Sequence, residues 1–415
     1  REGGDVVSLD MGRFRVFLLS HPDYVRDVLV VNHAKFEKGE VLEEPKRLLG
    51  EGLLTSEGAF HKRQRRVTQP VFHHERMSDH VDRMVERADR TTESWRDGKV
   101  VDVADAMLML TMSVLGMYVL DAEVADDQAR ETSRALATCL GMFGRLASPY
   151  AALLGQLPSR PNLEFERVLH AFDESVQRMI DLRRATGTQG SDALSQLMRV
   201  RDPDTGEAIP DRQLRDEILT FMIAGHETWT NSLIWTWFLL SQDEEVRAAL
   251  EAEIDEVLDG RLPGAEDVKA LRTAGAVYSE SLRLYPPVWT VGRTAIVDHE
   301  IDGHAIPKGS IVLVSPYVVQ HDPRWFPDPF AFRPQRWLSG EAQSVPTFAY
   351  FPFGAGPRVC IGQPLAMLTG PLFVSTIARR WRLDLVPGHP VEPSPPLLRP
   401  ANGLPMIARA RGGSR

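Results

Sequence analysis

The strongest chemical signal in the sequence is a cysteine inside a glycine-rich segment. Cys360 ends the run Phe-Gly-Ala-Gly-Pro-Arg-Val-Cys that starts at Phe353, and Gly362 follows two residues later. Glycine and proline at this density are typical of backbone that folds closely around a group. A helical stretch comes next, so Cys360 is predicted near a helix N-terminus, where N–H groups and the helix dipole stabilise a thiolate. With Arg358 nearby, the pattern favours a reactive thiolate over the buried core role of most free cysteines.

A second pair of residues has helical spacing. Glu280 and Arg283 lie three residues apart, which places a carboxylate and a guanidinium on one helix face. Taken alone, such a pair is read as an exposed ion pair that contributes about 0.2–0.5 kcal/mol.

A third segment, Ala-Gly-His-Glu-Thr, places polar groups inside an apolar stretch. His226 and Glu227 would be costly to bury without hydrogen-bond partners. The Thr228 hydroxyl has a simpler alternative, because threonine often bonds back to its own helix.

This segment lies in the middle of a long predicted helix. From Asp211 to Leu240 the sequence contains no Gly or Pro except Gly225, and apolar residues recur at helical spacing. Roughly thirty helical residues span about 45 Å. A glycine in a helix interior costs about 1 kcal/mol relative to alanine, so Gly225 indicates a close backbone approach or a local distortion.

Together these segments resemble the cytochrome P-450 family, from about Gly4 to Leu404. The family's haem-binding signature is matched at every fixed position, by Phe353, Gly356, Arg358, Cys360 and Gly362. The resemblance implies that Cys360 is the axial ligand of haem b (iron protoporphyrin IX) and that thiolate donation favours O–O cleavage.

The resemblance also assigns a structural role to the Glu280–Arg283 pair. The two residues look like the family's Glu-x-x-Arg motif, and Arg336 looks like the third member of the network. A buried Arg–carboxylate network of this kind would hold the irregular segment that precedes the cysteine.

Glu227 and Thr228 resemble the family's acid–alcohol pair. The resemblance implies that Thr228 hydrogen-bonds the iron-bound oxygen or its water, that Glu227 relays protons from solvent, and that Gly225 leaves room for O₂. Trp229, where many relatives carry a second threonine, is predicted to point away from the oxygen. Peroxide-driven members typically lack the acid–alcohol pair, so the resemblance favours O₂ with electrons.

Cations are implied around the haem propionates and on the electron-entry face. The propionate residues would be His61, Arg65, Arg293 and Arg358. A positive surface for an acidic ferredoxin or flavodoxin would be formed by Lys62, Arg63 and Arg66, which otherwise read as a solvated basic patch. The sequence has no nicotinamide- or flavin-binding stretch, so electrons from NAD(P)H would arrive through such a partner and its reductase.

The family builds its substrate pocket from scattered segments. Residues 42–54 and a lid around Ala147–Pro161 map to two of these segments. The pocket residues implied by the resemblance are Phe221, Ala224, Val288, Trp289, Thr290, Ala401 and Asn402. A bulky apolar wall at Trp289 favours a lipophilic substrate, such as a terpenoid or another specialised metabolite of the actinobacterial type.

The elements that position these residues are predicted as follows. Strands are predicted at Val6–Leu9 and Arg15–Leu19, helices from His61 to Leu284, short strands at Thr294–Tyr317, an irregular segment at His321–Pro357 and a helix at Leu365–Arg380. The fold class is mainly α (α+β): the cytochrome P-450 fold, a helix-rich body with a long central helix and a small β-rich lobe. One domain is predicted over residues 1–415.

The composition limits the function classes. The chain has 415 residues and a net charge of -9, which argues against general nucleic-acid binding. Two cysteines, Cys139 and Cys360, fit a reduced cytoplasm better than a disulfide framework. The apolar run Ala106–Leu120 has 15 residues, fewer than the ~20 that span a bilayer. A monomer is expected.

Three functions stay open from the sequence. The favoured one is a haem-thiolate monooxygenase that inserts one oxygen atom from O₂ into a lipophilic small molecule. The alternatives are a haem-thiolate peroxygenase or isomerase, and a non-catalytic haem-binding sensor. Consumption of O₂ with electrons, activity with peroxide alone, or absence of turnover would distinguish them.

Overall fold

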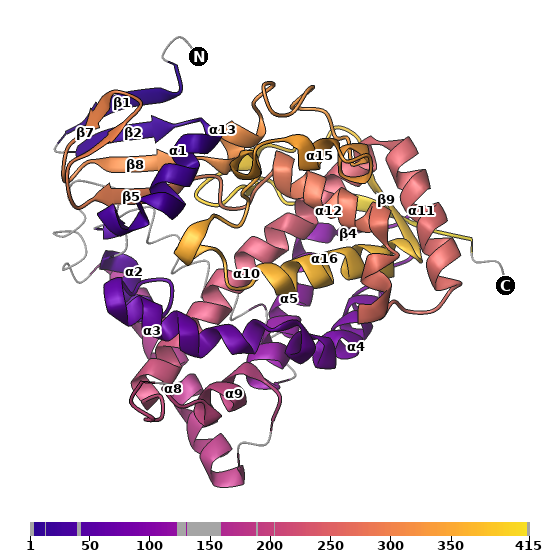
Figure 1. Ribbon diagram of the computed structural model, residues 1–415. Helices are drawn as coiled ribbons and strands as arrows, with labels where there is room; N and C mark the ends of the chain where they lie inside the picture. The colour runs from indigo at the N-terminus through magenta and orange to yellow at the C-terminus, as the bar shows by residue number, and fades with distance from the viewer. Residues whose placement is uncertain are drawn as a thin grey trace. The chain divides into compact units, whose positions relative to one another are not determined.

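The computed structural model describes residues 4–12, 14–39, 43–122, 130, 159–187, 190–202 and 204–412. Most of these residues lie in helices, and the strands form small sheets (Figure 1). The chain divides into two compact units: residues 1–39, 81–107 and 228–415 form the first, and residues 40–80 and 108–227 form the second. The single domain over residues 1–415 stays a prediction.

A five-stranded sheet forms the β-rich part of the first unit. Its strand order is β1 (Val6–Met11), β2 (Phe14–Leu19), β8 (Ile311–Val314), β5 (Val291–Ala295) and β3 (Phe36–Glu37). β2 and β8 run parallel, whereas the other neighbours are antiparallel. The two strands predicted near the start of the chain are therefore confirmed.

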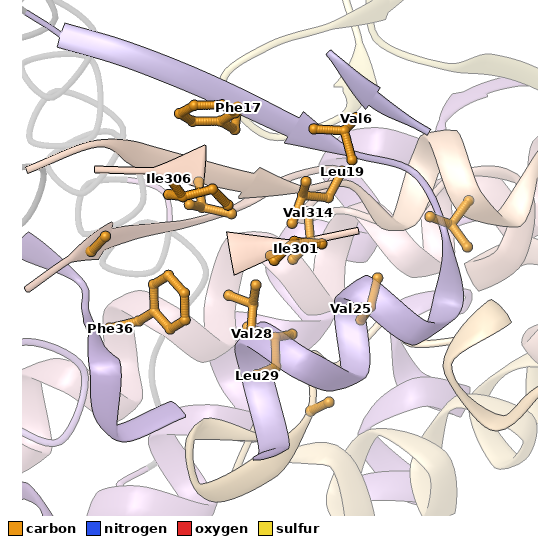
Figure 2. Close-up of a cluster of buried hydrophobic side chains, with 14 of the residues drawn as sticks. Val6, Phe17, Leu19, Val25, Val28, Leu29, Phe36, Ile301, Ile306 and Val314 are labelled. Atoms are coloured by element: carbon orange, nitrogen blue, oxygen red, sulfur yellow. The ribbon is translucent and has the colours of Figure 1, made fainter. Parts of the chain in front are cut away.

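The sheet buries one face against short helical segments. Phe17 and Leu19 of β2 are two residues apart and so share a face. They belong to one cluster of buried side chains with Val25 of α1 (Pro22–Arg26) and Val28 of η1 (Asp27–Val31) (Figure 2). Leu29 of η1 belongs to this core. Its backbone carbonyl also limits the position of the cysteine loop, as described below.

The strands predicted between residues 294 and 317 are largely confirmed. β5, β6 (His299–Ile301), β7 (His304–Ile306) and β8 occupy this region. The prediction is wrong at its end, because α13 (Pro316–Gln320) begins there. Ser315 caps this helix through the amide of Val318 and Pro316 occupies its first turn, two features that favour a helix start.

Helices and two small sheets complete the first unit. Its long helices include α11 (Glu244–Leu258), α12 (Arg272–Leu284) and α16 (Gln363–Ala378). One small sheet contains β4 (Val100–Asp102), β12 (Pro405–Ala410) and β9 (Trp381–Leu385), in that order. The other contains β10 (Pro393–Ser394) and β11 (Arg399–Pro400). The predicted irregular segment contains only short helices, among them α14 (Gln335–Leu338), α15 (Glu341–Ser344), η6 (Thr347–Ala349) and η7 (Gly356–Arg358).

The second unit is helical. It contains α2 (Glu43–Leu49), α3 (Gly58–Thr68), η4 (Gln69–Phe72), α8 (Arg160–Thr186) and α9 (Ala193–Arg199). Three helices have residues in both units: α4 (His74–Thr91), α5 (Val103–Leu120) and α10 (Asp211–Gln242). The long predicted helix is confirmed by the 32 residues of α10, which span about 48 Å.

One helix among the described residues is long and apolar enough to cross a membrane. This helix is α5, three residues longer at its start than the apolar run noted in the sequence. Because 72% of its apolar window is buried inside the protein, the helix reads as a core helix.

Candidate active site

The loop around Cys360 is closed by its own backbone. The Cys360 amide donates to the Phe353 carbonyl over 2.9 Å, and the Gly354 amide donates to the Phe351 carbonyl over 2.9 Å. α16 begins three residues after the cysteine, with Gly362 as its N-cap. The side chain of Cys360 is exposed and is not in a disulfide with another described residue. A thiolate there would lie beside a helix N-terminus. The second cysteine, Cys139, lies outside the described residues.

Glycine is required at one position of this loop by both conformation and space. Gly356 has a φ of +67°, and a Cβ atom on it would lie 1.9 Å from the carbonyl oxygen of Leu29. Gly354 also has a positive φ, +73°, but it faces open space. The loop therefore packs backbone to backbone against η1, and this contact fixes where Cys360 lies.

Glu280 is the centre of a buried polar network. The Arg283 guanidinium donates to both carboxylate oxygens, each over 2.9 Å, and Nε of Arg336 donates over 3.0 Å. Two further donors complete the set: Nε1 of Trp337 at 2.9 Å and the Arg333 amide at 3.0 Å. Glu280, Arg283 and Arg336 are fully buried, so the pair is not the exposed one that its spacing alone suggested.

The same two arginines hold the irregular segment. Arg283 donates to the carbonyls of Gln320, Pro329 and Ala331 over 2.7–3.0 Å. Arg336 donates to the Pro327 carbonyl at 3.2 Å and to Glu341 at 2.8 Å. Buried charges thus find partners on a chain segment that has little regular structure of its own.

Gln320 connects this network to the cysteine loop, a role that the sequence did not reveal. Its side-chain amide donates to the carbonyls of Leu282 and Arg283 over 3.1 and 2.9 Å. Its side-chain oxygen accepts from the Phe351 amide over 3.0 Å. The end of α12 is thereby joined to the start of the cysteine loop.

The middle of α10 has one accessible face. Ala224 is exposed, and Gly225, Glu227 and Thr228 are half-buried, whereas the neighbouring residues on the other faces are buried. Positions i, i+1, i+3 and i+4 share one side of a helix. The proposed acid and alcohol therefore lie together on the accessible side of an otherwise buried helix.

The remaining residues of the motif serve packing. His226 is 3% exposed, and its ring makes a hydrogen bond to the Leu108 carbonyl. Burial lowers the pKa of His226 to about 4, so the ring is neutral at pH 7. Trp229 is buried and stacks on Phe373 of α16 at 5.5 Å. Its orientation away from the oxygen stays a prediction. A Cβ on Gly225 would lie 3.1 Å from Leu115 of α5, so the glycine allows a close helix contact.

The four residues predicted to contact the haem propionates belong to two elements of one unit and to one helix of the other. His61 is buried and Arg65 half-buried on one side of α3. In the other unit, Arg293 of β5 is 9% exposed and donates to the Gly292 carbonyl, and Arg358 lies half-buried in the cysteine loop.

The predicted positive surface on α3 is partly neutralised. Arg63 lies 3.5 Å from Asp202, and Arg66 pairs with Asp204. Backbone hydrogen bonds from Asp204 and Thr205, with the nearby arginines, hold the pKa of Asp202 below its ordinary value. Two of the three cations expected to attract an acidic partner are thus already paired with carboxylates.

The pocket residues predicted after α12 are brought together with the C-terminal hairpin. Trp289 is 36% exposed and its Nε1 donates to the Pro396 carbonyl over 2.9 Å, while the Leu398 amide donates to the Pro287 carbonyl over 3.0 Å. Val288 is also partly exposed, Thr290 is half-buried, and both Ala401 and Asn402 are exposed beyond β11. In the other unit, Phe221 is buried edge-to-face against Phe72 at 5.1 Å.

An open cavity lies apart from these residues. Its volume is about 780 Å³, and its walls are mostly charged side chains of α2, α8 and the start of α10. None of the seven individually predicted pocket residues lines it, but Lys46, Arg47 and Gly50 of the predicted segment 42–54 do. In the predicted lid, residues 147–158 lie outside the described residues.

The residues present fit a haem-thiolate group. An exposed thiol stands at a helix N-terminus, in a loop whose glycines carry no side chain over it: a Cβ on Gly362 would lie 3.8 Å from Sγ of Cys360. Arg358 adds a cation in the same loop. When bound, haem supplies the redox chemistry that splits O₂.

Comparison with known proteins agrees with this geometry. The family model described as Cytochrome P450 matches residues 1–406. Similar proteins include "Cyclooctatin synthase" from Streptomyces melanosporofaciens, 38% identical over 98% of this chain and 89% of its own length. "Cyclooctat-9-en-7-ol 5-monooxygenase" from the same organism is 36% identical over the same shares. "Pentalenene oxygenase" from Streptomyces avermitilis is 32% identical over 94% of this chain and 86% of its own.

Solved structures show the same fold. The heme domain of cytochrome P450DA matches with a TM-score of 0.90 at 25% identity, covering 98% of this chain and 90% of that one. Retinoic acid-bound cyanobacterial CYP120A1 matches with a TM-score of 0.88 at 25% identity, covering 98% and 92%. The predicted fold class is confirmed, and with it the use of haem b, O₂ and electrons from NAD(P)H through partner proteins. The chain belongs to the cytochrome P450 family and is a haem-thiolate monooxygenase that inserts oxygen into a lipophilic small molecule.

Proposed function

We propose that the substrate is a cyclic terpenoid and that the product is its hydroxylated or further oxidised derivative. The supporting observation is the similarity, across almost the whole chain, to a cyclooctatin synthase and to two relatives that are named as oxygenases of cyclooctat-9-en-7-ol and of pentalenene. The partly exposed Val288 and Trp289 offer apolar surface of the kind that such a substrate needs.

The roles of the residues at the site follow from their chemistry. Cys360 holds the haem iron, in a loop formed by Phe353, Gly356 and Gly362. Thr228 and Glu227 hold and move protons at the oxygen that is reduced to water, and Gly225 leaves room for O₂ beside the helix backbone. Glu280, Arg283 and Arg336 position the cysteine loop through the segment that they hold. Support comes from the accessible face of α10 and the buried network around Glu280.

The propionates of the haem are assigned to His61, Arg65, Arg293 and Arg358. Each is a buried or half-buried cation or hydrogen-bond donor, the environment in which charge-assisted bonds to carboxylates are strong. Substrate contacts are assigned to Phe221, Ala224, Val288, Trp289, Thr290, Ala401 and Asn402. The enzyme works as a cytoplasmic monomer, and a ferredoxin or flavodoxin with its reductase supplies electrons.

An optical titration tests the substrate class. Ferric holoenzyme is titrated with cyclic terpene hydrocarbons and alcohols, and in parallel with fatty acids and macrolides. A saturable shift of the main absorption band with the terpenes alone, followed by an oxygenated product with NADPH, ferredoxin and reductase, supports the proposal. A shift and product with fatty acids or macrolides, and none with terpenes, contradicts it.

A further inference from the structure

The short helix η1, against which the cysteine loop packs, is a wide helical turn. The Asn32 amide donates to the Asp27 carbonyl, five residues earlier, over 2.8 Å, which is the hydrogen-bond pattern of a π-helix. The Asn32 side-chain amide also donates to the Asp27 carboxylate over 2.5 Å. Such turns are rare and frequently lie at functional sites. Asp27 thus closes this turn with both its backbone and its side chain.

Asp27 also binds a histidine of the hairpin formed by β6 and β7. Nε2 of His299 lies 2.6 Å from Oδ2 of Asp27, and Nζ of Lys35 lies 3.3 Å from Nδ1 of His299. A lysine ammonium can only donate, so Nδ1 accepts and the proton of the neutral ring is on Nε2. His299 therefore donates to Asp27, and its ring connects an ammonium to a carboxylate.

The Asp27–His299 pair is sheltered from solvent. The side chains are 27% and 7% exposed, respectively. The His299 ring also meets Phe36 edge-to-face, with the ring centroids 5.3 Å apart. A hydrogen bond to a charged acceptor is stronger than a neutral one, and partial burial reduces its competition with water. The pair can therefore hold η1 more firmly than an exposed ion pair would.

η1 is in turn the support of the cysteine loop. A Cβ on Gly356 would lie 1.9 Å from the Leu29 carbonyl oxygen. Ala355 and Leu29 belong to the same cluster of buried hydrophobic side chains. The loop is closed by the hydrogen bond from the Cys360 amide to the Phe353 carbonyl. A shift of η1 is therefore passed on to the loop that carries Cys360.

We propose that Asp27 and His299 are positioning residues for the haem ligand: their hydrogen bond fixes η1, and η1 limits the positions that Cys360 can take. Hydrophobic packing is non-directional, so the hydrogen bond supplies the direction that the buried cluster lacks. The importance of this position for haem rests on the proposed function, in which Cys360 holds the iron.

Two substitutions of His299 separate hydrogen bonding from packing. His299→Phe keeps a ring beside Phe36 and removes both hydrogen bonds, whereas His299→Gln loses the ring but offers a donor to Asp27 and an acceptor to Lys35. The matched control is Tyr24→Phe. It removes the hydrogen bond of 2.6 Å between Tyr24 of α1 and Asp302 in the turn of the same hairpin, and it leaves η1 untouched.

Hydrogen exchange of the holoenzyme measures how firmly the loop is held. We expect the protection of the Cys360 amide to fall roughly tenfold in His299→Phe, the effect of losing one hydrogen bond to a charged group. His299→Gln and Tyr24→Phe should stay close to the wild type. The Ala408 amide donates to the Lys99 carbonyl over 2.9 Å beside a different sheet, and its protection should not change in any variant.

Three results of this experiment would overturn the proposal. The first is unchanged protection of Cys360 in His299→Phe. The second is an equal loss at Cys360 and Ala408, which would mean a general loss of stability. The third is a loss in His299→Gln with none in His299→Phe, which would mean that the ring acts by packing. If His299→Phe does not fold, Asp27→Asn removes one acceptor and should lower Cys360 protection in the same selective way; unchanged protection overturns the proposal equally.

The spectrum of the reduced holoenzyme with carbon monoxide connects the loop to the haem. We expect a smaller fraction of the thiolate-ligated form in His299→Phe than in the wild type, and recovery of that fraction in His299→Gln. A full thiolate band beside a lowered Cys360 protection overturns the claim that the pair positions the ligand. Absence of the band in the wild type would instead refute Cys360 as the ligand, which the exchange experiment does not assume.

Discussion

The Glu280→Gln variant removes the charge from a carboxylate that five hydrogen bonds share. Arg283 and Arg336 would stay fully buried, with Glu341 as the remaining carboxylate that bonds Arg336. The glutamine would also place an NH₂ group, itself a donor, where a carboxylate oxygen now accepts hydrogen bonds. Breaking a buried ion pair by removing one partner costs about 3–5 kcal/mol, a large part of the ~5–15 kcal/mol that stabilises a typical folded protein.

Urea unfolding of the holoenzyme, followed by tryptophan fluorescence and by haem absorbance, measures this cost. We expect a much lower unfolding midpoint and loss of haem, because the segment that leads to Cys360 is held by the two arginines. The control is Asp10→Asn, which breaks an exposed pair with Arg15 at 3.2 Å and should leave the midpoint unchanged. If Glu280→Gln does not fold, Arg336→Lys keeps the charge while losing the guanidinium geometry and should give a smaller decrease. A midpoint equal to that of the control in both variants would refute the reasoning.

Two further substitutions test the assigned roles. Thr228→Ala should divert electrons from product to hydrogen peroxide, since a positioned proton donor accelerates proton transfer by about 10²-fold or more; an unchanged ratio of product to NADPH consumed would mean that another group delivers the protons. Gly356→Ala should lose haem, because its Cβ would lie 1.9 Å from the Leu29 carbonyl oxygen. The control Gly354→Ala should keep haem, because its Cβ meets no atom within 4 Å and its positive φ costs only about 1–2 kcal/mol. Equal haem contents in the two variants would contradict the packing argument.

The site could be predicted from sequence where its residues lie close together in the chain. The cysteine loop spans ten residues, so residue type and spacing were sufficient to single it out. Glu280 and Arg283 are one helical turn apart, but their spacing alone suggested an exposed pair, and only the resemblance to the family indicated a buried network. The long α10 was predictable because a single glycine interrupts a stretch free of helix breakers.

Contacts between distant segments were not predictable. Gln320 reaches Phe351 across 31 positions and Leu53 reaches Glu217 across 164, and neither residue type at these positions signals a partner. The pairing of Arg63 and Arg66 with Asp202 and Asp204 was missed for the same reason. A basic run reads as positive surface until the fold brings acidic residues beside it.

The central claim is that Cys360 is the thiolate ligand of the haem. The measurement is the absorption spectrum of the reduced protein with carbon monoxide, recorded for the wild type and for Cys360→Ala. The account predicts the band of a thiolate-ligated haem in the wild type and its loss in the variant. Cys360 is the exposed cysteine among the described residues. Retention of that band in Cys360→Ala would contradict its assignment as the haem ligand.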